Sequence, residues 1–212
     1  MHHCAYCRVF ACESGAEERP GNCPMKETEL MDEVISEYND TENRDFFIKA
    51  AEVEGEGYGE WNRVREIIEL SKKMGYHDIG VAFCVGLKEE AKIFSRILEE
   101  RGFTVHSVAC KNGANDKCEF GIAEEAKVEP GFEPACNPIG QAKFLAEENV
   151  DFAVVLGLCV GHDSLFYKYF NRYSDAFCTT LVVKDRALGH NPAVALYQAD
   201  GYMENSFGDK KK

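Results

Sequence analysis

The sequence has few basic residues, and this shortage excludes one class of partner. Its 24 lysines and arginines stand against 37 acidic residues, which gives a net charge of −13. A nucleic-acid-binding protein needs clustered Lys and Arg side chains to neutralise phosphates. The one basic run is 210–212, which we interpret as a solvated tail. We therefore expect no nucleic-acid partner, and the acidic surplus by itself indicates no other partner.

Membrane and secretory features are also missing. No apolar run approaches the roughly 20 residues that a membrane-spanning helix needs. The first residues lead directly into a polar, thiol-rich segment, where a signal peptide would have an apolar core. The sequence thus predicts a cytoplasmic protein with no membrane partner. Disulfides are rare in the cytoplasm, so clustered cysteines are expected to bind metal or to carry out redox chemistry.

Cysteine, by contrast, is abundant, with ten in 212 residues. A Cys-x2-Cys pair near the N-terminus places two thiols on one turn, which suits a tetrahedral metal ion or two corners of an iron–sulfur cluster. Because four thiolates favour soft or borderline metals, the segment predicts structural zinc or an iron–sulfur cluster. His2 and His3 are alternative ligands, and four ordinary reduced cysteines are the plain alternative. The predicted metal ligands are Cys4, Cys7, Cys12 and Cys23.

The remainder of the chain predicts an α/β fold. Hydrophobic residues make up 45% of the sequence, enough for a real core. Helices are expected over 26–38, over 43–53 with a break at the glycines 55, 57 and 59, and over 60–74. Further on, apolar strands over 78–84, 103–110, 151–159 and 179–184 alternate with helices over 89–100, 138–149 and 163–172, with a long loop at 111–135.

This alternation predicts a mostly parallel sheet of four or five strands with helices on both faces. No internal repeat is present. We expect three parts: a cysteine-rich metal knuckle over 1–25, a helical segment over 26–75 that packs on the main domain, and the α/β domain over 76–212.

A second group of cysteines follows the predicted strands. In an open parallel sheet, ligands bind outside the carboxyl ends of the strands. The sequence therefore predicts a second cofactor site at this edge, with a [4Fe–4S] cluster held by Cys84, Cys110, Cys136 and Cys159. The alternative is that each thiol packs as a small apolar side chain. Cys118 is a substitute member, and Cys178 is expected to lie in the core.

The segment Gly157-Leu-Cys159-Val-Gly161 lies between a strand and a helix, as a nucleophile elbow does. This context makes Cys159 a candidate catalytic nucleophile, with His162 or His190 as its base. The same glycines would equally let the backbone approach a cluster or an anion. The residues after the last strand, 184–186 and 189–192, are expected only to line the same crevice.

Several segments together resemble an uncharacterised metal-binding protein family known as domain of unknown function 1847. The resemblance is carried by residues 83–87, 136–139, 157–166, 183–186 and 189–192, and the last third of the chain is the most specific. It implies a cysteine-rich soluble protein typical of anaerobic microbes, with a metal-binding label inferred from its cysteines. It implies no substrate or reaction, but an anaerobic origin favours iron–sulfur over zinc.

Three functions follow from these patterns. The leading one is an iron–sulfur or zinc protein with a cluster or small molecule at its strand ends, engaged in electron transfer, redox or sulfur chemistry. Its expected partners are an electron-transfer protein or a small-molecule ligand. The second is a cysteine-nucleophile hydrolase or amidotransferase that uses Cys159, with structural zinc at the N-terminus. The third is a zinc-binding interaction module without catalytic activity.

Overall fold

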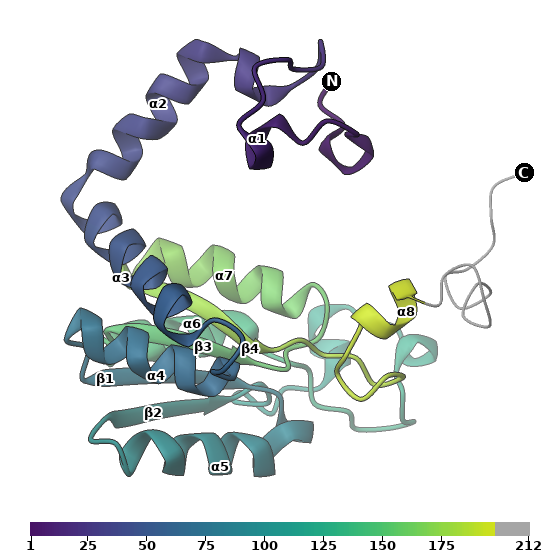
Figure 1. Cartoon of the computed structure of the whole chain (residues 1–212). Helices are drawn as coiled ribbons and strands as arrows, with labels where there is room; N and C mark the ends of the chain where they lie inside the picture. The colour runs from purple at the N-terminus through teal and green to yellow at the C-terminus, as the bar shows by residue number, and fades with distance from the viewer. Residues whose placement is uncertain (198–212) are drawn as a thin grey trace, which may run out of the picture. The chain divides into compact units, whose positions relative to one another are not determined.

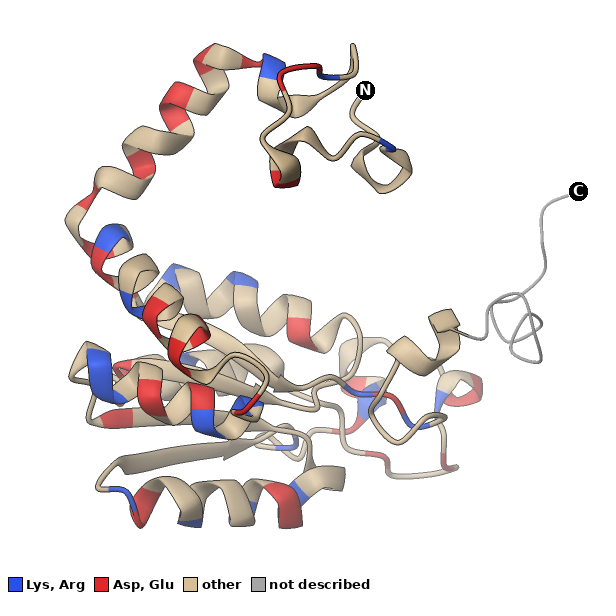
Figure 2. Ribbon diagram, viewed as in Figure 1, with Lys and Arg blue, Asp and Glu red and all other residues tan. Residues whose placement is uncertain are grey.

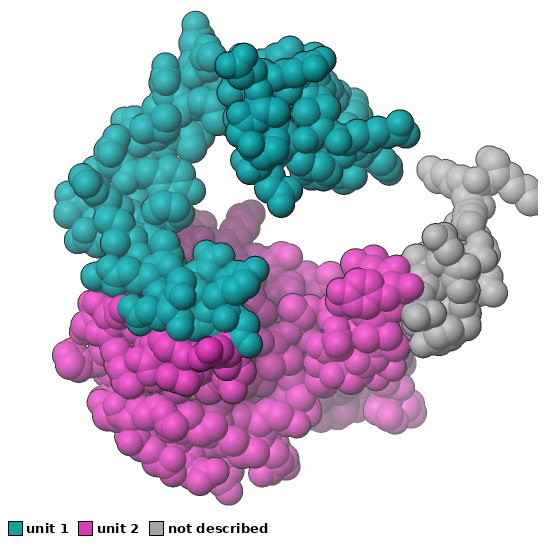
Figure 3. Space-filling model, in the orientation of Figure 1, with its two compact units in different colours: residues 1–59 teal, residues 60–212 magenta. Residues whose placement is uncertain are grey.

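Strands and helices alternate along the chain in the order that the apolar pattern predicts (Figure 1). The computed structural model describes residues 1–197, so the three lysines interpreted as a tail lie outside the described part. The chain divides into two compact units, residues 1–59 and residues 60–212 (Figure 3).

The second unit contains a four-stranded, all-parallel sheet, which confirms the predicted fold class. Its strands lie side by side in the order β2-β1-β3-β4. All five residues of β3 are buried, as expected for a central strand covered on both faces, whereas the edge strands are partly exposed. The strand bounds are β1 Asp78–Phe83, β2 Thr104–Ala109, β3 Phe152–Leu156 and β4 Phe177–Val182.

Helices cover both faces of this sheet, also as predicted. α5 and α7 lie on opposite faces in Figure 1, and α6 packs closely against α7. This arrangement follows from right-handed crossovers, because the chain moves outward from β1 to β2 and then back across the sheet to β3 and β4. The helix bounds are α4 Arg63–Met74, α5 Lys88–Glu99, α6 Pro138–Glu147, α7 His162–Tyr173 and α8 Ala193–Tyr197.

Local signals set where two of these helices begin and end. The Asn62 side chain accepts a hydrogen bond from the backbone of Arg65, and Gly75, at a φ of +72°, ends α4 as predicted. Asn137 caps α6 by accepting from the backbone of Gly140, with Pro138 in the first turn. These caps fix the segments that lead into β1 and away from β2.

The strand order places a topological switch point between β1 and β3, since the chain leaves these two neighbours in opposite directions. Ligands of open parallel sheets bind at the carboxyl ends of the strands at such a point. The residues that follow β1 and β3 include Cys84 and Cys159. The fold therefore directs attention to the carboxyl edge of the sheet.

The predicted loop over 111–135 contains two short 3-10 helices, η4 Lys117–Phe120 and η5 Glu124–Ala126. A nearly buried lysine, Lys127, closes the loop with ion pairs to Asp116 at 3.0 Å and to Glu124 at 2.8 Å. Lys117 adds a further pair with Glu133 at 2.7 Å. The loop is thus held by charge rather than by an apolar core, and it joins Cys110 to Cys136.

The first unit begins with short turns and ends in two helices. Its elements are η1 Cys4–Tyr6, α1 Ala11–Ser14, η2 Pro24–Lys26, α2 Thr28–Asn39 and α3 Thr41–Gly57. Asp40 separates α2 from α3 and caps α3, and the rings of Tyr38 and Phe47 lie 4.8 Å apart across this junction. Acidic residues occur along the length of α2 (red in Figure 2).

The predicted helix break at Gly55 is wrong. α3 continues through Gly55 to Gly57. Of the three glycines in this cluster, only Gly59 has a positive φ, +72°. A glycine inside a helix costs only about 0.5–1 kcal/mol relative to alanine, which the rest of the helix offsets.

Within residues 1–197, no helix is long and apolar enough to cross a bilayer.

Candidate functional site

Backbone hydrogen bonds bring three cysteine-bearing segments together at the carboxyl edge of the sheet. The amide of Cys84 donates to Leu156 at 3.1 Å, and the amide of Cys110 donates to Phe83 at 2.9 Å. The carbonyl of Cys110 in turn accepts from Asn137, the residue after Cys136, at 2.7 Å. Cys84, Cys110 and Cys136, here called the strand-edge trio, are therefore anchored to one another through the main chain.

Side-chain amides reinforce the junction between the second and third members of the trio. Asn112 donates to the carbonyls of Ala109 and Asn137, both at 3.0 Å. Asn137 donates back to the Asn112 side chain at 2.8 Å. Lys111 hydrogen-bonds the carbonyl of Pro134, just before Cys136. The two ends of the long loop are thus clasped at the point where their cysteines lie.

A fully buried glutamine links all three segments. Gln141 of α6 donates its side-chain amide to the carbonyls of Phe83 at 3.1 Å and Val108 at 2.7 Å. Its own backbone amide donates to Asn137. The side-chain oxygen of Gln141 is buried and has no hydrogen-bond partner among residues 1–197. One residue thereby fixes the ends of β1 and β2 to the start of α6.

The three thiols interact in sequence, with Cys110 in the middle. Interaction with Cys110 lowers the pKa of Cys84 to about 5 and that of Cys136 to about 4. The same interactions, with Cys136 first and then Cys84, raise the pKa of Cys110. The backbone amide of Val85 donates to the Cys110 sulfur at 3.4 Å. These shifts favour the thiolate forms of Cys84 and Cys136 and the protonated form of Cys110.

His162, the first residue of α7, faces Cys136 rather than Cys159. The Cys136 thiolate raises the pKa of His162, and His162 contributes to the lowered pKa of Cys136. Lys111 also favours the thiolate form of Cys136 by its charge. Cys136 and His162 therefore make a cysteine–histidine pair that the sequence analysis did not single out.

Cys159 has a partner outside this chain of thiols. Its sulfur accepts a hydrogen bond from the Arg186 guanidinium at 3.1 Å, and this contact raises the pKa of Arg186. Lys184 approaches Cys84 and favours its thiolate form. Two basic residues of the segment after β4 thus reach these thiols.

His190 is engaged within its own loop. Its ring nitrogen Nδ1 accepts a hydrogen bond from the backbone of Asp185 at 3.0 Å, and its backbone, at a φ of +67°, donates to the carbonyl of the same residue. His162 contacts Cys159 only through the main chain, where its amide donates to the Cys159 carbonyl at 2.9 Å. Within residues 1–197, neither the His162 ring nor the His190 ring hydrogen-bonds the Cys159 sulfur. The remaining two cysteines also lie outside the trio: Cys118 is exposed beside Glu124, and Cys178 packs against the core, where burial raises its pKa to about 11.

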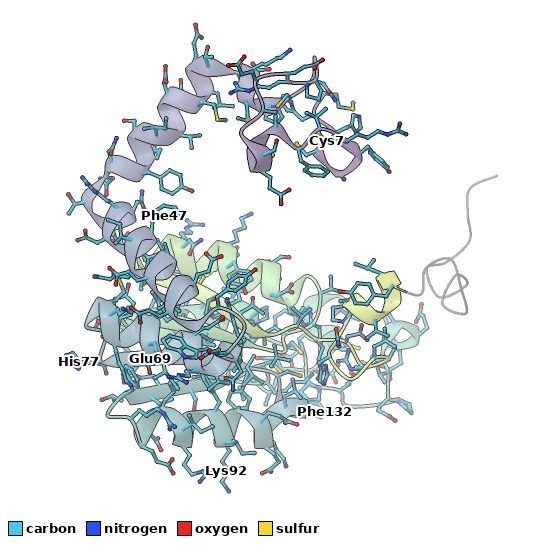
Figure 4. The ribbon with its side chains drawn as sticks, in the orientation of Figure 1. Cys7, Phe47, Glu69, His77, Lys92 and Phe132 are labelled. Atoms are coloured by element: carbon cyan, nitrogen blue, oxygen red, sulfur yellow. The ribbon has the colours of Figure 1, made fainter. Side chains whose placement is uncertain are left out.

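The four N-terminal cysteines line one cavity of about 460 Å³. Its walls also carry apolar side chains, among them Tyr6, Phe10 and Met25. The backbone amide of Phe10 donates to the Cys7 sulfur at 3.4 Å (Cys7 is labelled in Figure 4). Amide-to-sulfur hydrogen bonds tune thiolates that hold metal. The His2 ring hydrogen-bonds the carbonyl of Asn22 at 3.1 Å, so this side chain is held in place although it lies near the N-terminus.

Neither the N-terminal cysteines nor the strand-edge trio has the geometry of a formed metal site. In the part of the chain that the structure describes, no three Cys, His, Asp or Glu side chains stand closely enough to hold one ion. All ten cysteines are free thiols. The donor sets still fit a thiophilic metal, because they consist of thiols with amide donors and cations nearby, and a bound metal would draw the sulfurs together.

A parallel α/β sheet with free thiols at its switch point defines the structural class. The chain belongs to the family described as "Protein of unknown function (DUF1847)", whose model matches residues 23–181. It is also 41% identical over 194 residues to the uncharacterized protein MJ0455 of Methanocaldococcus jannaschii, which covers 92% of this chain and 93% of that protein. No solved structure matches. The family description names no metal and no activity.

Some residues of the site carry a signal that the sequence analysis missed. Gln141 stands one residue before Ala142 on the buried stripe of α6, where a polar side chain calls for a partner. Lys111 directly follows Cys110. Lys184 and Arg186 were expected only to line the crevice, but each contacts a named thiol.

Proposed function

We propose that this chain is a metal-binding redox protein whose principal centre is a thiophilic metal or iron–sulfur cluster held by Cys84, Cys110 and Cys136. The observation that supports it best is the convergence of these three thiols from segments far apart in sequence. Soft thiolate donors suit zinc, copper(I) and iron–sulfur clusters. The N-terminal cysteines would hold a second metal site of their own.

The surroundings of the trio support the metal over simple packing. Free cysteines that merely fill a core need no charged neighbours, yet Lys111, His162 and Lys184 all favour the thiolate forms here. Gln141 and Val85 add hydrogen bonds that fix the strand ends and one sulfur. Second-layer contacts of this kind orient ligands and tune a bound metal.

The count of ligands points to the chemistry. Three thiols supplied by the trio would leave one coordination position open, which favours reaction with a small molecule over simple electron transfer. Cys159 stands nearby but is held by Arg186. When bound, the metal would supply electron transfer or Lewis-acid chemistry, and the protein would supply the thiols and a positively charged flank.

Anaerobic purification of the full chain tests the proposal. We expect iron with acid-labile sulfide and broad visible absorption, or stoichiometric zinc in a colourless protein. The triple variant C84S/C110S/C136S should lose the strand-edge metal, whereas C178S, which removes a core thiol outside the trio, should keep it. Equal metal content in the triple variant and the wild type would refute the assignment.

The Cys136–His162 pair favours a second candidate function, that of a cysteine-nucleophile enzyme. An imidazolium beside a thiolate activates it for attack on a carbonyl or a disulfide. This candidate predicts a metal-free protein as isolated, with Cys136 the fastest cysteine to be alkylated and with H162A slowing that reaction. Protection of Cys136 by bound metal would count against it.

A further inference from the structure

The segment after β4 presents two cations, Lys184 and Arg186, to the thiols. Neither forms an ion pair with a carboxylate anywhere in residues 1–197, although the chain has a large acidic surplus. Their contacts are with sulfur: Arg186 with Cys159 and Lys184 with Cys84. Because neither cation has a carboxylate partner in this part of the chain, a small anion can compete with the sulfurs for them.

The one carboxylate between these cations is turned away from them. Asp185 accepts hydrogen bonds from the backbone amides of Ala187 at 3.0 Å and Leu188 at 2.9 Å. Its own backbone amide donates to His190. Asp185 therefore shapes the loop that carries Lys184 and Arg186, and its charge is used within that loop.

Two glycines lie beside the path of the Lys184 side chain. A Cβ atom on Gly86 would lie 3.5 Å from the Lys184 Nζ atom and 3.7 Å from the Cys84 sulfur. Gly157, at a φ of +67°, lies beneath the Lys184 stem, where a Cβ would be 3.9 Å from its Cδ atom. The Lys184 side chain thus passes next to both glycines and ends near Cys84.

The region is open to solvent at Cys159. Cys159 is half-buried and its neighbour Val160 is 93% exposed. A small molecule can therefore reach the Arg186 guanidinium without a change in the core. A guanidinium offers a planar fork of donors that matches a carboxylate, and a lysine adds a point charge.

We propose that Lys184, Arg186 and Cys159 form a binding site for a small carboxylate molecule beside the strand-edge trio. That this molecule is the substrate of the thiol centre rests on the proposed function. The binding itself rests on the two cations, which have no carboxylate partner within residues 1–197, and on the open approach to Cys159.

The test compares two alkylating reagents of similar size on the full chain. Iodoacetate carries a carboxylate and iodoacetamide is neutral, so their rate ratio at Cys159 reports attraction of an anion and cancels the intrinsic reactivity of the thiol. Labelling at Cys159 is quantified by peptide mass spectrometry. The variants are Arg186→Gln, Lys184→Gln and, as a matched control on the exposed face of α5, Lys92→Gln.

We expect the iodoacetate-to-iodoacetamide ratio to fall about fivefold in Arg186→Gln, the size expected for one unit charge at about 4 Å in water. It should fall in the same direction in Lys184→Gln and stay at the wild-type value in Lys92→Gln. In Arg186→Lys, which keeps the positive charge, the rate ratio should stay close to the wild-type value. A ratio unchanged in Arg186→Gln and Lys184→Gln overturns the site, and so does a Cys159 that neither reagent can reach.

Metal analysis of the same preparations separates the two proposals. A charge-dependent ratio in a protein that binds no metal would leave the carboxylate site standing and refute the metal centre. A metal-replete protein whose ratio ignores both substitutions would do the reverse.

Discussion

The N-terminal cysteines and the strand-edge trio differ in how their members are brought together. The first four span residues 4–23 and are gathered by short turns, whereas the trio spans residues 84–136 and is gathered by a parallel sheet. A local cluster is visible in the sequence as spacing. A cluster assembled by strand order becomes visible only once the order of the strands is known.

The two regions also differ in what supports them without metal. The first unit buries little apolar surface, and only Ala11, Val53 and Gly57 are buried in its 59 residues. The trio sits on the hydrophobic core, with Cys84 and Cys110 themselves buried. We therefore infer that metal would contribute to folding in the first region and mainly to chemistry in the second.

The largest expected effect tests this difference directly. C4S/C7S should remove the N-terminal metal almost completely and leave the amides of residues 1–26 unprotected from hydrogen exchange, because little else holds that segment. Strands β1 and β3 should keep their protection. Metal analysis and hydrogen exchange by mass spectrometry check both parts, and loss of protection in the sheet would show that the two regions are not independent.

The next effect should be confined to the trio. Gln141→Leu removes the two hydrogen bonds that tie the ends of β1 and β2 to α6, and we expect metal affinity at the trio to fall about tenfold to a hundredfold. Competition with a chelator measures the affinity. Ser71→Ala is the matched control, since Ser71 is equally buried and donates to Ile67 at 2.8 Å away from the thiols.

Both variants should lose about 1–3 kcal/mol of unfolding free energy, as expected when a buried hydrogen bond is removed. Only Gln141→Leu should change metal affinity. Equal affinities in the two variants would reduce Gln141 to a structural role.

A smaller effect concerns the long loop that joins Cys110 to Cys136. The backbone amide of Cys118 and then Lys127 hold the pKa of Asp116 below its usual range, and Lys127 lowers the pKa of Glu124. A lowered pKa in the folded protein stabilises the loop above the ordinary carboxyl values, roughly pH 4, and this contribution is lost as the pH falls through the folded values.

We therefore expect the rate of cleavage within residues 111–135 of the wild type to rise below about pH 4. An acid-active protease measures this rate. In Lys127→Met the loop should already be cleaved faster at neutral pH, and acid should add less. The described N-terminal segment 1–26, in which no ion pair is present, is the internal comparison. A loop whose cleavage ignores both pH and Lys127 would contradict this account of its closure.

Much of the fold could be predicted from the sequence, because the apolar periods of 3.6 and 2 are strong in this chain. The helix end at Gly75 and the helix start at Pro138 were both predicted from single residues with one dominant conformation. The continuation of α3 through Gly55 was not, since a glycine lowers helix propensity by an amount that neighbouring turns can offset.

The site could be predicted only in part. The strand-end rule placed Cys84 and Cys110 at one edge. The position of Cys136 depends on the hydrogen bond from Asn137 to the carbonyl of Cys110, across a loop of 25 residues that has no periodic pattern. The partner of Cys159 likewise depends on how the segment after β4 turns, which Asp185 and its loop amides determine.

The central claim is that Cys84, Cys110 and Cys136 hold one metal centre. An anomalous diffraction map of the anaerobically purified protein, recorded at the absorption edge of the metal found, tests it most directly. We predict a peak bonded to these three sulfurs, at about 2.3 Å if the metal is zinc, with Cys159 outside bonding distance and next to Arg186. A metal-replete crystal without that peak, or with a peak bound only elsewhere, would contradict the account.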